Sequence, residues 1–105
     1  MDAKSEKVRD QVKALAAQFL QRESNHLSLI TVTDVRLNHD GGLAHIFFTV
    51  LPQDKEKAAL EFSKRKRSEF REFVKKNSRI QRLPFFDFAI DEGEKNRQRA
   101  DELLK

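Results

Sequence analysis

Four consecutive basic residues, Lys64 to Arg67, interrupt the apolar pattern of a helical segment in the middle of the chain. Phe62, Phe70 and Phe73 fall on one side of such a helix. At about 100° per residue, Lys66 falls within the same stripe. A straight buried helix would bury this lysine, so we expect the chain to bend there. The alternative is that Lys66 extends past the edge of the core.

The segments around the bend predict an α+β fold. Apolar residues recur at three- and four-residue steps near the N-terminus, which is typical of an amphipathic helix. Three alternating apolar segments predict strands, and Asp40-Gly41-Gly42 between the first two predicts a hairpin turn. A change of phase at 33–34 predicts a β-bulge. The expected order is αββααβ, with a helix at 5–22, strands at 30–37 and 43–51, helices at about 54–66 and 68–76, and a strand at 85–90.

Local chemistry predicts where several of these elements begin and end. Asp54 follows Pro52 and is a candidate helix cap, whereas Asn77 and Ser78 are typical of a helix terminus. The acidic residues after the last strand favour a turn, and they are Asp91, Glu92 and Glu94.

Composition narrows the class of protein. The chain has 105 residues, which predicts one domain over residues 1–105, and it has no cysteine, which excludes disulfides and thiolate metal sites. No apolar run reaches the roughly 20 residues of a membrane span, and the first residues lack the apolar centre of a secretory signal. We expect a cytoplasmic monomer that does not interact with membranes.

Three stretches together resemble the ribosome-binding factor A family, whose members are small RNA-binding domains of the type II K-homology (KH) fold. The stretches are LITVTDVRLNHDGGLAHIFFTVL (29–51), RIQRLPFFDFAID (79–91) and RADELL (99–104). The resemblance implies a single type II KH-like domain, with a three-stranded sheet packed on one face by three helices. The family's kinked Ala-x-Gly connection aligns with Lys66-Arg67-Ser68, where this chain has neither the alanine nor the glycine. The Gly-x-x-Gly loop of KH domains that bind single strands has no counterpart here.

The resemblance also implies a function. It implies an assembly factor that binds the small (30S) ribosomal subunit, contacts 16S rRNA near the decoding region, and assists late maturation and rRNA processing. It implies no catalytic activity and no cofactor. The alternative within the same fold is another KH-like RNA-binding or ribosomal protein.

Positive charge is concentrated in one segment. Residues 63–82 hold nine bases and two acids, a net charge of +7, whereas the whole chain carries +4. Segregated basic charge favours a polyanionic partner, here RNA phosphates. The predicted RNA-binding residues are Lys64, Arg65, Lys66, Arg67, Arg71, Lys75, Lys76, Arg79 and Arg82.

Other chemistry is weaker in this sequence. Asp87 and Asp91 lie four apart on the last predicted strand, and two carboxylates on one face are the basis of a less favoured alternative, a Mg²⁺-dependent nuclease. No third acid or general base is spaced to join them. The histidines, at 26, 39 and 45, are too scattered to predict a metal site. Phe47, on the wetter face of its strand, is a candidate for base stacking, although edge packing is favoured.

Overall fold

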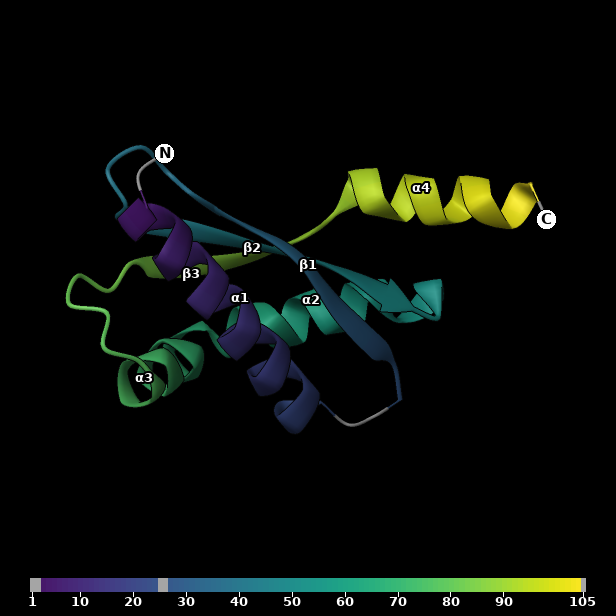
Figure 1. Ribbon diagram of the computed structural model, residues 1–105. Coiled ribbons are helices and arrows are strands. Elements are labelled where there is room, and N and C mark those ends of the chain that lie inside the picture. Colours follow the sequence, from purple (N-terminus) through teal and green to yellow (C-terminus); the bar gives the residue numbers. More distant parts are fainter. Residues whose placement is uncertain (1–2, 25–26, 105) are drawn as a thin grey trace.

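The computed structural model describes residues 3–24 and 27–104 and confirms the α+β class. Figure 1 shows helices packed along a short sheet and the C-terminal helix projecting beyond it. The elements are α1 (Ala3–Glu23), β1 (Leu29–Leu37), β2 (Leu43–Leu51), the 3-10 turn η1 (Gln53–Lys55), α2 (Glu56–Arg65), α3 (Arg67–Asn77), β3 (Phe85–Ile90) and α4 (Glu92–Leu103).

The strands form one mixed sheet in the order β1-β2-β3. β1 and β2 are antiparallel across the predicted hairpin, in which Gly41 has a φ of 75°, a conformation that favours glycine. β2 and β3 are parallel, as the intervening helices permit. The register of β1 shifts between Val32 and Asp34. The bulge therefore lies at Thr33, as predicted.

One face of the sheet forms the core with α1, α2 and α3. Phe19 of α1, Phe70 of α3 and Phe88 of β3 are buried. The ring centroids of Phe19 and Phe70 are 5.3 Å apart, and those of Phe70 and Phe88 are 5.7 Å apart. A fully buried phenylalanine contributes about 1.5–3 kcal/mol to stability. This aromatic cluster therefore holds α1, α3 and the sheet in fixed positions.

The helical segment after β2 breaks at Lys66, as predicted. Lys66 has φ −95° and ψ 8°, so α2 ends at Arg65 and α3 begins at Arg67. Its side chain is 30% exposed, lies with Nζ 5.9 Å from the centroid of the Phe62 ring, and forms a 3.2 Å ion pair with Glu69. The bend and the outward-directed lysine, which we considered as alternatives, occur together.

Two predictions about helix starts are wrong. Asp54 does not cap α2, because it lies within η1 and Lys55 takes the N-cap position without a side-chain hydrogen bond. Asp91, Glu92 and Glu94 begin a helix rather than a turn. The Asp91 carboxylate caps α4 by accepting the Glu94 N–H at 3.0 Å. None of the described residues of α4 is buried, so no apolar stripe marks this helix in the sequence.

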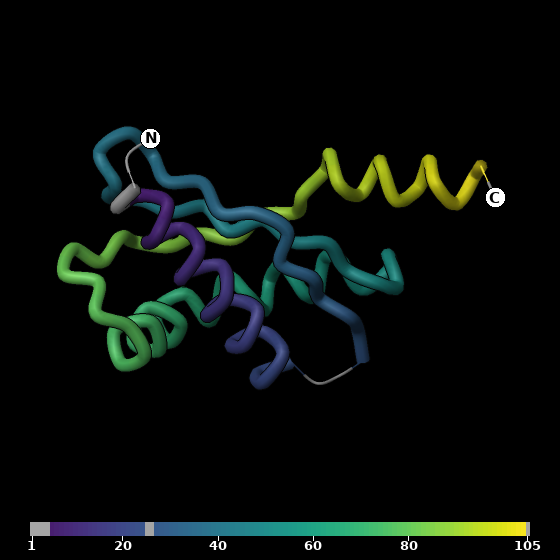
Figure 2. The backbone as a smooth tube through the Cα atoms, in the orientation of Figure 1, coloured from purple at the N-terminus to yellow at the C-terminus, as the bar shows by residue number. Residues whose placement is uncertain are grey.

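Among the described residues, a backbone hydrogen bond from the Asp91 N–H to the Phe48 carbonyl, at 2.8 Å, and two side-chain contacts attach α4 to the domain. The hydroxyl of Thr33, at the β-bulge, donates to the Asp91 carboxylate, and Lys95 Nζ lies 3.1 Å from Glu56 Oε1 of α2. The hydrogen bond from Thr33 and then that from the Glu94 N–H hold the pKa of Asp91 below its usual value. The backbone path in Figure 2 shows α4 leaving the body of the domain directly after β3. The bulge in β1 therefore fixes the start of α4.

Replacing Asp91 by Ala should loosen α4 while the core stays folded, because it removes the N-cap and the Thr33 contact together. Loss of an N-cap costs about 1 kcal/mol, so amide hydrogen exchange at Glu94 should quicken about fivefold. Exchange at Phe48, in the centre of the sheet, should not change. Asp101→Ala, at an exposed acid of the same helix, is the matched control. Equal exchange at Glu94 in the two variants would contradict this role for Asp91.

Candidate nucleic-acid interface

The structure divides the nine predicted RNA-binding residues into three groups along α3. The first group, which we call the elbow bases, surrounds the break before α3. The second is a single arginine within α3, and the third lies at the end of α3 and in the connection to β3. The elbow bases are Lys64, Arg65, Lys66 and Arg67. The single arginine is Arg71, and the third group is Lys75, Lys76, Arg79 and Arg82.

Two of the elbow bases converge on Asp87 of β3. Lys64 Nζ lies 3.1 Å and Arg67 Nη1 3.3 Å from Asp87 Oδ1. Burial alone would raise the pKa of Asp87, but hydrogen bonds from Lys64 and the Phe88 N–H, with the two basic charges, outweigh it and lower the pKa. Part of the elbow's charge is therefore neutralised within the protein, and this contact ties the break to β3.

The other two elbow bases differ in their surroundings. Lys66 is paired with Glu69, as described above. Arg65 is exposed and forms no ion pair with another residue in the described part of the chain. Arg65 is therefore the elbow base that is most available to a ligand.

Arg71 has a structural role. Its Nε donates to the Pro84 carbonyl and its Nη2 to the Leu83 carbonyl, both at 3.2 Å. Its guanidinium also lies 4.7 Å from the centroid of the Phe85 ring. The planar fork of arginine suits two neighbouring carbonyls. Arg71 thus holds the chain where it enters β3, and we expect it to contribute less to RNA contact than the exposed bases.

Three bases of the third group line a cleft of about 1060 Å³ between α1, the hairpin and the connection from α3 to β3. They are Lys76, Arg79 and Arg82, and α1 adds Lys7. None of the described residues that line this cleft is acidic. We call this concave, positively charged site the α1 cleft. Lys75 is exposed on α3 but does not line the cleft.

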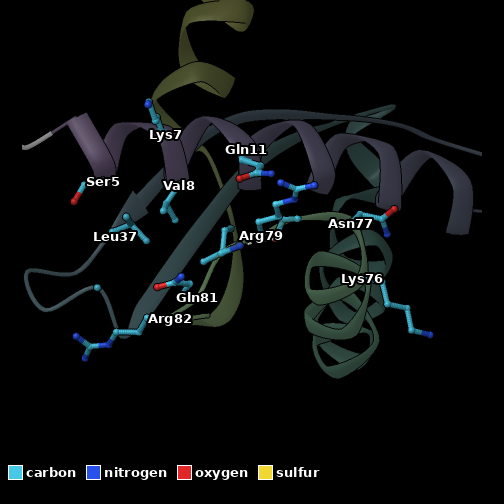
Figure 3. A pocket seen from close by; sticks show the side chains of 13 residues that line it. Ser5, Lys7, Val8, Gln11, Leu37, Lys76, Asn77, Arg79, Gln81 and Arg82 are labelled. Carbon is cyan, nitrogen blue, oxygen red and sulfur yellow. Dashed lines mark hydrogen bonds between the residues drawn. The ribbon is translucent and has the colours of Figure 1, made fainter.

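Figure 3 shows how the side chains of the α1 cleft are arranged. Arg79 extends toward α1 and lies near Gln11, whereas Lys76 and Arg82 extend outward at opposite ends. Val8 and Leu37 form an apolar part of its lining.

The sequence did not predict the part that α1 plays in this site. Lys7 and Gln11 are four residues apart on the polar side of α1. This spacing predicts that the two side chains share a face of the helix, but it does not predict which segment lies beside that face. They meet the 76–82 segment because α1 and α3 pack together through Phe19 and Phe70. That contact between distant segments has no counterpart in the local pattern.

The second face of the sheet carries Phe47 and His45. Phe47 is partly buried, and Arg36 lies 5.4 Å from the centroid of its ring, in agreement with the favoured edge packing. Its use in base stacking remains a prediction. His39 and His45 are within the described residues, whereas His26 lies outside them. Among residues 3–24 and 27–104, no group of three or more potential ligands is placed to hold a metal ion.

Asp87 and Asp91 have separate structural partners. Asp87 accepts from two bases and Asp91 accepts from Thr33 and from the backbone of α4. Both oxygens of Asp91 and Oδ1 of Asp87 are thus engaged with donors inside the protein, which argues against a nuclease built on these two residues.

The fold defines the structural class of this protein. An αββααβ order around a mixed sheet, with a break between the two middle helices, is the arrangement of type II KH-like domains, and an additional helix, α4, follows it. The chain belongs to the ribosome-binding factor A family, because the family model described as "Ribosome-binding factor A" matches residues 4–104.

Individual relatives agree with this assignment. The ribosome-binding factor A of Thermobifida fusca is 33% identical over 108 residues, an alignment that covers 97% of this chain and 70% of the relative. The crystal structure of ribosome-binding factor A from Thermus thermophilus superposes with a TM-score of 0.71 at 25% identity. It covers 80% of this chain and 91% of that chain.

A second Thermus thermophilus comparison involves a homology model of ribosome binding factor A fitted into the cryo-EM map of a 30S complex. It matches with a TM-score of 0.66 at 28% identity and covers 77% of this chain and 88% of that chain.

No helix in the described residues of our protein is long and apolar enough to cross a membrane.

Asp87→Asn should destabilise the protein by about 1 kcal/mol at neutral pH, because Lys64 and Arg67 lose their shared partner and both are partly screened by solvent. The pKa of Asp87 is lowered in the folded state, so its contribution is present above the unfolded pKa of about 4 and is lost as pH falls through the folded pKa. Urea denaturation at several pH values tests this. The two proteins should differ at pH 7 and converge as the pH falls through the lowered pKa of folded Asp87.

The control for this experiment is Asp101→Asn, which changes an exposed acid that forms no ion pair with another described residue. A constant difference between wild type and Asp87→Asn across the whole pH range would assign the effect to packing rather than to charge.

Proposed function

We propose that this protein binds the small ribosomal subunit through 16S rRNA phosphates and assists its late maturation, including rRNA processing near the decoding region. It acts as a binding factor without catalysis or a cofactor, as a cytoplasmic monomer. The whole described fold, residues 3–24 and 27–104, serves as a single KH-like RNA-binding domain.

The observation that carries this proposal is the segregation of basic charge onto one segment that the fold leaves largely accessible. Residues 63–82 carry a net charge of +7 within a chain of +4. Arg65, Lys75 and Lys76 are exposed, as are Arg79 and Arg82. Lysine and arginine that neutralise phosphates release counterions, which supplies affinity with little dependence on base sequence.

The shape of the basic surface supports recognition of folded RNA. A-form RNA presents phosphates and 2′-hydroxyls at fixed spacings, and proteins recognise it mainly by that shape. The rigid core beneath α3 holds the basic residues in a fixed arrangement. A homology model of the related Thermus thermophilus factor has been fitted into the cryo-EM map of its 30S complex, which supports the small subunit as the partner.

The alternative function within the same fold is that of a ribosomal or general RNA-binding protein. Sedimentation with ribosomal particles separates it from the proposed assembly factor. We expect the purified protein, added to cell extract, to sediment in sucrose gradients with free small subunits and not with joined ribosomes. A component of the mature ribosome would also appear with joined ribosomes. Sedimentation with neither particle would overturn the proposed partner.

Charge reversal at three exposed bases tests the surface itself. Arg65→Glu, Lys75→Glu and Lys76→Glu, made together, should weaken binding to small subunits and reduce the log-log salt slope by roughly two to three units, about one per phosphate contact. These side chains form no ion pair with another described residue, so thermal melts should change little. Titration at four salt concentrations provides both quantities.

The matched control is Lys13→Glu, Lys57→Glu and Arg99→Glu, which makes the same change in net charge at exposed positions outside residues 63–82. It should retain most of the affinity and most of the slope. Equal losses in the two triple variants would show that only the overall charge matters, and the surface assignment would then be wrong.

A further inference from the structure

The lining of the α1 cleft combines two kinds of surface that a nucleic-acid strand requires. Lys7, Lys76, Arg79 and Arg82 supply positive charge without an acidic neighbour among the described lining residues. Three partly buried apolar side chains that also pack against the core supply the rest, and they are Val8, Leu37 and Ile80. Phosphates suit the first surface, and the flat faces of unpaired bases suit the second.

Neutral amide groups add the capacity to read base edges. Gln11 of α1 and Gln81 of the connection to β3 are exposed and line the cleft. Each carboxamide offers two donors and one acceptor, the complement of a base edge. Asn77, which also lines the cleft, donates its side-chain N–H to the Phe73 carbonyl at 2.8 Å, and its own side-chain carbonyl oxygen is an acceptor.

The dimensions of the cleft favour one strand over two. Its volume of about 1060 Å³ is slightly above the range of about 300–1,000 Å³ for small-molecule sites, so it has room for more than one nucleotide. A duplex presents paired bases inside and phosphates on a convex surface, and it cannot place a base against an apolar floor. At the elbow, by comparison, three of the four bases are engaged by acids of the protein: Lys64 and Arg67 by Asp87, and Lys66 by Glu69.

We propose that the α1 cleft binds a single strand of RNA, with phosphates at its basic rim and unpaired bases against Val8, Leu37 and Ile80. This inference rests on the proposed function as an RNA-binding factor and specifies the class of RNA at one site. The site lies at the opposite end of α3 from the break between α2 and α3. That break is where KH domains with a Gly-x-x-Gly loop bind single strands, so this chain uses a different position.

The experiment uses the full chain and a fluorescein-labelled RNA strand of about six nucleotides, within the usual site size for single strands. We expect the strand to bind at least tenfold more tightly than a blunt duplex of the same sequence. Lys7→Glu with Arg79→Glu should weaken binding of the strand at least tenfold and reduce its salt slope by about 1.4 units. Lys13→Glu with Lys57→Glu, which changes the net charge equally outside the cleft, should weaken it less than threefold.

Chemical-shift mapping on the wild-type protein keeps the test valid if the double variant does not fold. Adding the unlabelled strand should shift the backbone amide signals of Gln11, Gly41 and Gln81 more than those of Arg65 and Lys66. Larger shifts at the elbow than at the cleft would overturn the proposal. Equal or tighter binding of the duplex, or of a poly-glutamate peptide of the same charge, would overturn it as well, since the cleft would then recognise charge alone.

The oligonucleotide and subunit experiments separate the two proposals. If the wild-type protein sediments with small subunits but the strand does not bind at the cleft, this inference is wrong and the proposed function stands. If neither the subunit nor any RNA binds, the proposed function itself is wrong.

Discussion

The break at Lys66 is the constraint on which the rest of the structure depends. A continuous helix from Glu56 to Asn77 would be about 33 Å long, longer than a sheet of six- to nine-residue strands can cover. The break lets both halves pack, so that Ala59 of α2 and Phe70 of α3 are buried together. Its cost is small, because the Lys66 N–H donates to the carbonyl of Phe62 at 3.2 Å and the Lys66 carbonyl accepts the Phe70 N–H at 2.8 Å.

The break also explains why the basic segment has two roles. Bases on a turn point in several directions, and those directed toward the sheet find partners within the protein. Lys64 and Arg67 meet Asp87, and Arg71 meets the carbonyls before β3. These contacts hold the start of β3 beside the break, and the strand then pairs with β2. The bases directed away from the sheet remain exposed. The net charge of +7 over residues 63–82 is therefore larger than the charge that a ligand would meet.

The sequence predicted much of the fold because the strong patterns are local. The strands Leu43–Leu51 and Phe85–Ile90 have the predicted bounds, and the bulge at Thr33 and the break at Lys66 lie where the apolar phase changes. α4 was missed because its stability comes from Asp91, Thr33 and a few ion pairs rather than from an apolar stripe. The α1 cleft could not be predicted, since it unites residues 5–11 with residues 76–82 through a tertiary contact.

α3 sets the distance between the two accessible parts of the basic surface. Its 11 residues span about 16 Å, and Phe70 and Val74 anchor it in the core along that length. Arg65 lies before one end, and the α1 cleft begins at the other, with Lys76. Because a buried helix does not stretch, a ligand must present phosphates at this separation to reach both. A folded rRNA site in which a single strand leaves a helix has two such backbone segments, whereas free single strands or plain duplexes satisfy only one part. Under the proposed function, the rigidity of α3 would therefore favour an RNA of matching shape over one recognised through any single base contact.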